Sequence, residues 1–321
     1  MTPKEFNDSI KRGEFKRVYL LYGEERYLVN HYAEALAAAI GEPDNFDSST
    51  PAAGIIMAAE NLPFLADMRL IRVRDSRLFA SGRKAESEAM TAYLPTIPDT
   101  TVLVFTESEV DRRGRLYKKV AELGGAVDCE TPSPQALTTW LARIFNEKGK
   151  SIDPAAANIL IRNAAHNMTT LTQETQKLAA YVGKRPTVTT QDVEDICSPT
   201  LQTRVFDMIA AIANGRTAIA LDMYHNMLLM KEQPLMILAM IIRQLRIILM
   251  VTAASDKRMP KAQMAKTLGL RSFVVDEALS QSRRFTINKL FKALSNCQDI
   301  DSKVKTGLIN AEIGVELLIM Q

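Results

Sequence analysis

The stretch "RVYLLYGEERYLVN", residues 17 to 30, joins a short apolar run to a glycine and then to a segment with helical spacing. A strand, a glycine turn and a helix in this order make the first half of a βαβ unit. Strands are predicted at 17–23, 69–75, 101–107 and 126–130, with helices at 27–40, 51–61, 84–94 and 112–123. Strands that alternate with helices predict an α/β domain whose mostly parallel sheet is covered on both faces.

The strand signal ends at the proline-containing segment "TPSP", residues 131 to 134. Beyond it, apolar residues recur every three or four positions, as they do from Leu238 to Ile248, which is typical of helices that bury one face. Helices are expected to begin at Pro154 and Pro234, because proline at the first helical position loses no intrahelical hydrogen bond. We predict three domains: an α/β domain at 1–134, a small helical domain at 135–209 and a larger helical bundle at 210–321.

The composition limits the classes of function. The chain has 321 residues with 40 Lys or Arg and 37 Asp or Glu, so its net charge of +3 gives no general case for binding DNA or a membrane. Its first residues lack the apolar stretch of a signal peptide, and its three cysteines form no CxxC pair, so we expect a cytoplasmic protein. The apolar run 235–251 contains Arg243 and Arg246, which are costly in a bilayer, and is therefore expected to be a buried helix.

An α/β domain followed by a small helical domain is the layout of AAA+ ATPases, so the turn after the first strand is where a phosphate-binding loop would lie. Such a loop needs further glycines, a Lys for the phosphates and a Ser or Thr for magnesium. Here Gly23 is followed by Glu24 and Glu25, and the strand at 69–75 ends in the single acid Asp75. We predict a degenerate nucleotide site, in which the two glutamates lie in a solvated turn or act as charges at the start of a helix.

No other constellation for catalysis or metal binding is found in the sequence. The three histidines, His31, His166 and His225, have no metal-ligand spacing with one another or with a cysteine. The motifs GxSxG, HExxH and GxGxxG are absent from the sequence. We therefore expect no catalytic residue, no metal site and no cofactor.

Five segments, in this order along the chain, resemble the bacterial DNA polymerase III delta subunit family. They are "YLLYGEERYLVNHY" (19–32), "LPFLADMRLIRVRD" (62–75), "LTQETQKLAAYVG" (171–183), "AKTLGLRSFVVDEAL" (265–279) and "DIDSKVKTGL" (299–308). The first is similar to the family's degenerate phosphate loop, and the second to its leucine-proline-phenylalanine element before a strand. The resemblance extends over essentially the whole chain.

The resemblance implies a subunit of the DNA polymerase III holoenzyme, a nucleotidyltransferase, with no catalytic activity of its own. It implies an AAA+-like α/β domain that does not hydrolyse ATP, a helical lid domain and a C-terminal collar that joins the motor subunits and delta prime. Such a subunit binds the sliding clamp (the beta subunit), holds one ring interface open and meets primed DNA only within the assembled loader. The alternatives are an active AAA+ ATPase and a DNA-binding helical adaptor.

The segment "NLPFLADMRL" (61–70) is unusually apolar for a loop. Pro63 pushes Leu62 toward an extended conformation, which should end the preceding helix near residue 61. From the residues alone, these side chains would pack under the sheet edge. The resemblance instead places Phe64 and Leu65 on the family's clamp-contacting pair, with Leu62, Pro63 and Met68 as neighbours. Leu65 and Ala66 stand where many relatives have aromatic or polar residues.

Basic residues are frequent in the C-terminal bundle. They are Arg243, Arg246, Lys257, Arg258, Lys261, Lys266, Arg271, Arg283, Arg284, Lys289, Lys292, Lys303 and Lys305. They indicate either a solvated face with contacts to neighbouring subunits or a surface that follows DNA phosphates inside the loader. A methionine-rich stripe from Met223 to Met240 is expected in the core, with an adaptable subunit contact as the alternative.

Overall fold

The computed structural model describes residues 1–63 and 66–321. The chain divides into two compact units, Met1–Thr131 and Pro132–Gln321, which are described separately. The division falls at the start of the "TPSP" segment.

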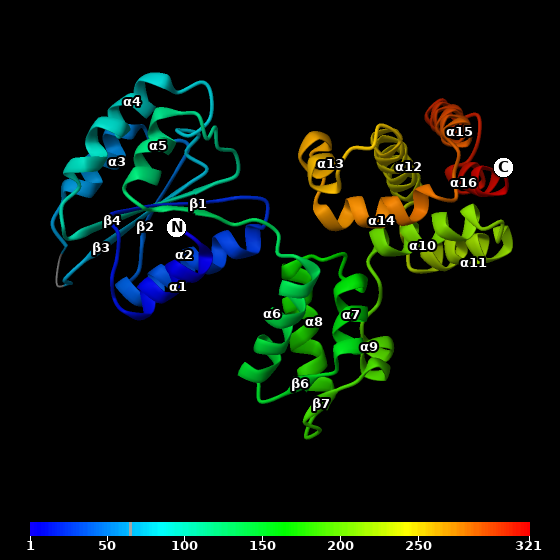
Figure 1. Cartoon of the computed structure of the whole chain (residues 1–321), viewed down its shortest axis with the longest axis horizontal. Helices are drawn as coiled ribbons and strands as arrows, with labels where there is room; N and C mark the ends of the chain where they lie inside the picture. The colour runs from blue at the N-terminus through cyan, green and yellow to red at the C-terminus, as the bar shows by residue number, and fades with distance from the viewer. Residues whose placement is uncertain (64–65) are drawn as a thin grey trace. The chain divides into compact units, whose positions relative to one another are not determined.

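The first unit is built on a five-stranded sheet in the order β2-β3-β4-β1-β5, and all its strand pairs are parallel (Figure 1). Its elements are α1 (Pro3–Lys11), β1 (Val18–Tyr22), α2 (Arg26–Ile40), β2 (Asp44–Asp47), α3 (Ala52–Glu60), β3 (Arg69–Arg74), α4 (Lys84–Tyr93), a 3-10 turn η1 (Leu94–Thr96), β4 (Thr101–Glu107), α5 (Arg115–Glu122) and β5 (Ala126–Asp128). The predicted α/β class with a parallel sheet is confirmed.

Strand β2 was not predicted from the sequence. Its four residues, "DNFD", are mostly exposed and pair only with β3, at the edge of the sheet. Phe46 alone packs against the core. A polar edge strand has neither the apolar run nor the alternation that identifies a buried strand, so nothing in this segment distinguished it from a loop.

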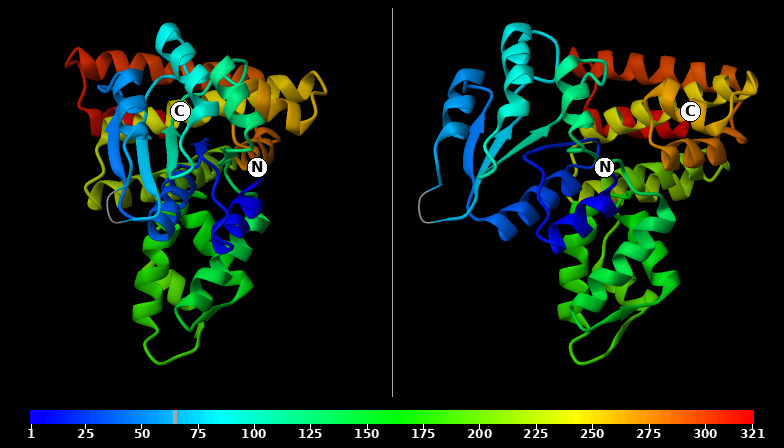
Figure 2. Two further views of the ribbon diagram at one scale, coloured as in Figure 1. Left: turned by 90° about the vertical axis from the view of Figure 1, so that its left-hand side faces the viewer. Right: turned by 60° about the vertical axis from the view of Figure 1, so that its left-hand side comes forward.

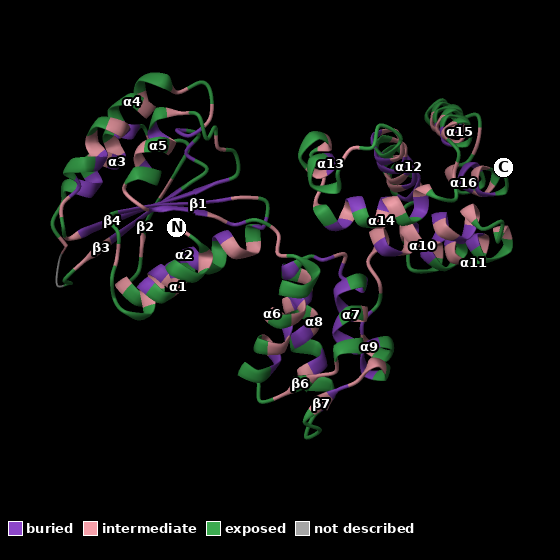
Figure 3. Ribbon diagram, viewed as in Figure 1, coloured by how far each residue is buried: buried purple, intermediate pink, exposed green. Residues whose placement is uncertain are grey.

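Both faces of the sheet are covered, because successive side chains of a strand point to opposite faces. Leu20 and Phe105 contribute to an apolar core with residues of α3, α4 and α5. Tyr19 and Val104 contribute to a second core with residues of α1 and α2. The two layers of helices are seen on opposite faces of the sheet in Figures 1 and 2, and the central strands are buried along their length (Figure 3).

The second unit is helical except for two short strands. Its elements are α6 (Pro134–Glu147), β6 (Ser151–Ile152), α7 (Pro154–Asn163), α8 (Met168–Tyr181), β7 (Thr187–Val188), α9 (Thr190–Ile196), α10 (Leu201–Ala213), α11 (Thr217–Leu229), α12 (Pro234–Asp256), α13 (Lys261–Leu268), α14 (Ser272–Ser282), α15 (Ile287–Lys305) and α16 (Ala311–Met320). The expectation of no strand after residue 134 was wrong, because β6 and β7 pair in parallel. Strands of two residues are too short to show a periodicity.

Helix α12 is the centre of the bundle. It begins at Pro234, as predicted, and α7 begins at Pro154. By length and composition α12 is the one helix of the described chain that could span a membrane. Ile241, Leu245 and Ile248 are nevertheless buried in a core that α12 shares with α10, α11, α15 and α16, so the helix is packed as the sequence predicted.

Two expectations about the bundle were wrong in detail. Helix α10 is continuous across residue 210, where the sequence placed a domain boundary. The helical spacing is the same on both sides of that residue, so the pattern contained no signal for the true end of the helix. Within the methionine stripe Met227 is buried, but Met230 and Met236 are 55% and 52% exposed, since each lies beside the break between α11 and α12.

Candidate functional site

The turn between β1 and α2 lies where a phosphate loop would lie, at the carboxyl edge of the sheet. Gly23 has φ 137°, and a Cβ atom there would lie 2.5 Å from the carbonyl oxygen of Cys129. The backbone N–H of Glu25 donates to that same oxygen at 3.0 Å. The turn is therefore held tightly against the end of β5, and only glycine fits its first residue.

Glu25 is the N-cap of α2 and is buried, whereas Glu24 is exposed. The Glu25 carboxylate accepts a hydrogen bond from the backbone N–H of Tyr27 at 3.2 Å. Helix N-termini attract anions because their first N–H groups lack intrahelical partners and carry partial positive charge. Here a carboxylate of the chain itself occupies that position, which fits the predicted helix-start charge for Glu25 and a solvated turn for Glu24.

A second buried carboxylate, Glu107, lies at the same edge, at the end of β4. It accepts hydrogen bonds from the Ser76 N–H at 2.9 Å, the Ser76 hydroxyl at 2.5 Å and the Arg77 N–H at 3.3 Å. Burial raises the pKa of Glu107 to about 7, against these hydrogen bonds, which lower it. Glu107 was not predicted as a site residue from the sequence, although a Glu that ends the apolar run "TVLVFTE" was the available signal.

Asp75, the single acid predicted after β3, is also engaged within the chain. Its Oδ1 accepts from the backbone N–H of Ser108 at 2.9 Å, and its Oδ2 lies 3.7 Å from a guanidinium nitrogen of Arg26. Asp75 has φ 44°, a left-handed conformation that few residues other than glycine adopt. Its carboxylate therefore holds the loops after β3 and β4 together.

The segment between α3 and β3 lies at the opposite, amino edge of the sheet. Helix α3 ends at Glu60 and Asn61 is extended, as Pro63 predicted. Leu62 is 79% exposed and Pro63 is half-buried. The predicted anchor pair, Phe64 and Leu65, lies outside the described residues.

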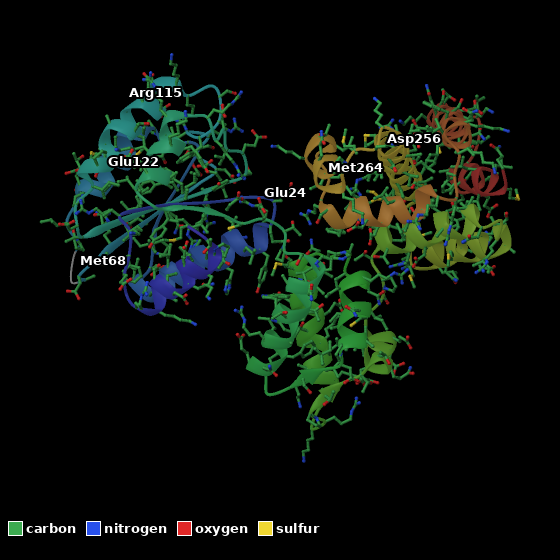
Figure 4. All side chains as sticks on the ribbon, in the orientation of Figure 1. Glu24, Met68, Arg115, Glu122, Asp256 and Met264 are labelled. Atoms are coloured by element: carbon green, nitrogen blue, oxygen red, sulfur yellow. The ribbon has the colours of Figure 1, made fainter. Side chains whose placement is uncertain are left out.

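The flanks of this segment are fixed by contacts on both sides. Arg69 forms an ion pair with Asp44 of β2 at 2.6 Å and donates to the carbonyl oxygen of Asn61 at 3.3 Å. Met68 is half-buried and packs against the core beneath α1 and α2. Of the predicted neighbours, Leu62 is therefore open to a partner, while Met68 contributes to the chain's own packing. Figure 4 labels Met68 at this edge and Glu24 at the other.

The basic residues of the second unit differ in their surroundings. Lys261, Lys303 and Lys305 pair with Asp276, Asp299 and Asp301 respectively. Arg243 and Arg246 are exposed and line a groove of about 630 Å³ between α12 and α15, together with apolar residues such as Leu235 and Met250. This mixture of apolar and cationic side chains is common at protein interfaces, whose cores are rich in Met and Arg.

Segments of both units match models of the same protein family. The family model described as DNA polymerase III, delta subunit, matches residues 19–130, and the model for the C-terminal domain of the DNA polymerase III delta subunit matches residues 202–321. DNA polymerase III subunit delta of Bacillus subtilis is 25% identical over 98% of this chain and 94% of its own length. A probable DNA polymerase III subunit delta of Aquifex aeolicus is 21% identical over 60% of this chain and 59% of its own.

The solved structure of the Bacillus subtilis DNA clamp loader delta protein superposes with a TM-score of 0.79 and 25% identity. The alignment covers 99% of this chain and 98% of that one. The resemblance seen in the sequence and the predicted AAA+-like fold class, with C-terminal helices, are confirmed. The chain belongs to the DNA polymerase III delta subunit family.

Proposed function

We propose that this chain binds a sliding clamp through residues 62–68, holds one ring interface open and does so without hydrolysing ATP. The observation that carries the proposal is the exposed Leu62, 79% accessible in a loop whose flanks are fixed by Arg69 and Met68. An exposed apolar residue on a fixed base is a suitable anchor, because little conformational freedom is lost on binding. Phe64 and Leu65, which the family resemblance assigns to the clamp contact, follow directly.

The energy available from this loop is sufficient for specific binding. Burying a Leu or Phe side chain contributes about 1.5 to 3 kcal/mol, and a few central residues usually supply most of the binding energy of an interface. Binding can open a ring only if the subunit fits the opened interface better than the closed one. The proposed mechanism therefore requires a difference in fit between two clamp conformations and no covalent step.

Two features support the absence of ATP hydrolysis. The Glu25 carboxylate occupies the N-terminus of α2, where the phosphates of a nucleotide would bind, and Gly23 packs against the backbone of Cys129. We expect a titration of the purified chain with a fluorescent ATP analogue to show no binding at submicromolar concentration. Binding in that range, lost on mutation of residues 23–25, would favour the AAA+ ATPase alternative.

The second unit is proposed to supply the contacts with other loader subunits. The helices from α6 to α9 would form the lid, and those from α10 to α16 the collar, which would join the motor subunits and delta prime. The groove with Arg243 and Arg246 supports such a role, since it combines apolar and cationic residues. Contact with primed DNA is proposed only within the assembled complex, and the protein is proposed to work in the cytoplasm.

The decisive experiment measures binding of the full chain to an immobilised sliding clamp from the same organism. The variant Phe64→Ala/Leu65→Ala is expected to bind at least about a hundredfold more weakly, since two anchors are lost. Leu62→Ala should weaken binding about tenfold. Leu229→Ala is the matched control, because Leu229 is 81% exposed on α11 of the other unit, and its binding should be unchanged.

The same variants separate binding from folding. The Tm of the Leu62 and Leu229 variants should stay close to that of the parent chain, because exposed side chains contribute little to stability. The same is expected of the double variant if Phe64 and Leu65 serve the clamp and not the core. Clamp binding that survives the double substitution would contradict the proposal, and so would a large fall in Tm, which would place these side chains in the core.

A further inference from the structure

The helical bundle contains a second cavity, separate from the groove lined by Arg243 and Arg246. It has a volume of about 330 Å³ and lies between α10, α12, α15 and α16. Its floor is apolar and is formed by Ile209, Ile212, Ile241, Leu245, Phe285 and Leu318. This volume is within the usual range for ligand pockets, about 300 to 1,000 Å³.

The rim of this cavity is basic. Arg284, Lys289 and Lys292 line it and are exposed, and in the described part of the chain no Asp or Glu side chain forms an ion pair with any of them. Further along the same helix, Lys303 and Lys305 each pair with an aspartate at 2.7 Å. No Asp or Glu side chain of the described residues therefore neutralises the three rim cations, which concentrate positive charge at this rim.

The polar groups of the wall favour a peptide over other anions. Asn296 lines the cavity and carries both a donor and an acceptor, which suits the amide groups of a peptide backbone. Nucleic-acid bases prefer to stack on aromatic or guanidinium planes, and this lining contains one of each, Phe285 and Arg284, whereas most of it is aliphatic. The aliphatic floor instead suits Leu, Ile or Phe side chains.

We propose that this cavity binds a short acidic peptide segment of a partner protein. One or two apolar side chains of the segment would enter the floor, and its carboxylates would face Arg284, Lys289 and Lys292. The basic rim complements the carboxylates of such a segment and the apolar floor complements its hydrophobic side chains. Neither feature depends on clamp binding by the first unit.

The test uses the full chain and a fluorescein-labelled peptide, Glu-Asp-Leu-Glu-Asp-Phe-Asp-Leu, followed by fluorescence anisotropy. We expect a Kd on the order of 10 μM. A peptide with Gln and Asn in place of the acids, and one with Ser in place of the apolar residues, should each bind at least about tenfold more weakly, because each lacks one of the two complementary features.

Variants of the protein test whether the peptide binds in this cavity. Lys289→Glu/Lys292→Glu should weaken binding at least about tenfold, whereas Lys257→Glu/Lys266→Glu, with the same change of net charge outside the cavity, should change it less than about twofold. Ala213→Trp should abolish binding by filling the cavity, since Ala213 lines it at the end of α10. Circular dichroism checks that each variant is folded.

Several results would overturn the proposal. An undetectable interaction would do so, and so would equal weakening by the two charge-reversal variants or equal binding of the serine peptide, either of which would indicate unspecific attraction. Competitors identify another ligand class: displacement of the probe by oleate or by a single-stranded oligonucleotide at a lower concentration than by unlabelled peptide would assign the cavity to a lipid or to nucleic acid.

Discussion

The two edges of the parallel sheet in the first unit differ in how they meet their surroundings. At the carboxyl edge, the buried carboxylates of Glu25 and Glu107 accept hydrogen bonds from backbone N–H groups of their own chain. At the amino edge, the loop before β3 leaves Leu62 exposed. Ligands of open α/β sheets usually bind at the carboxyl edge. Backbone N–H groups that already donate to carboxylates of their own chain are not available to a ligand. Binding of a partner is therefore expected at the amino edge.

The largest effect is expected from a substitution at Gly23, which tests how closely the turn after β1 packs against Cys129. Gly23→Ala should destabilise the first unit by about 3 kcal/mol, because the new Cβ would meet backbone atoms of Cys129 in a disfavoured conformation. Denaturant unfolding monitored by circular dichroism measures this loss. Gly13→Ala is the control: Gly13 also has positive φ, at 67°, but nothing lies within 4 Å of its Cβ position, so its cost should be about 1 kcal/mol. Equal costs would mean that the edge is not closely packed.

A smaller effect is expected from the pH dependence of the same edge. The raised pKa of Glu107, about 7, means that the folded chain holds this proton more tightly than the unfolded chain. Stability from this group is therefore present below the unfolded value near 4.5 and is lost as pH rises through about 7. When the pH rises from 5 to 7.5, the free energy of unfolding of the parent should fall by about 1 to 3 kcal/mol more than that of the Glu107→Gln variant.

Thermal unfolding at several pH values measures this difference. Glu122→Gln serves as a control, because Glu122 is an exposed carboxylate of α5 that pairs with Lys119. Parallel pH profiles for the parent and Glu107→Gln would show that Glu107 does not titrate in this range.

The smallest effect concerns the amino edge. Arg69→Ala removes the ion pair with Asp44 and should cost at most about 1 kcal/mol of stability, as partly exposed pairs do. Clamp affinity should nevertheless fall several-fold, because the loop loses the contact that fixes its flank. Arg113→Ala removes a comparable pair with Asp111 at the carboxyl edge and should leave clamp binding unchanged. Equal clamp binding by the two variants would show that the flank does not orient the loop.

Much of the fold follows from local patterns, because buried strands and capped helices have distinct sequence signals. The four apolar strands were predicted to within two residues of their observed ends. The helix starts at Pro154 and Pro234 were also predicted, since proline fits only the first turn of a helix. Strand β2 and the pair β6 and β7 were missed, because their pairing depends on neighbours distant in sequence rather than on their own side chains.

The candidate site was predictable only in part. The sequence showed that the β1–α2 turn lacks the residues of a phosphate loop, but it did not show which of the two glutamates caps α2. It likewise gave no sign that Met68 packs inward while Leu62 remains exposed, since both are apolar residues of one short loop. Such differences arise from tertiary packing, which a pattern along the chain does not contain.

The cap that Glu25 places on α2 has a consequence for control of the subunit. Under the proposed function, a domain that binds no nucleotide would not change its conformation with the cellular ratio of ATP to ADP. Its affinity for a clamp would then be constant, and the timing of binding would depend on other subunits that cover or expose the loop at the amino edge.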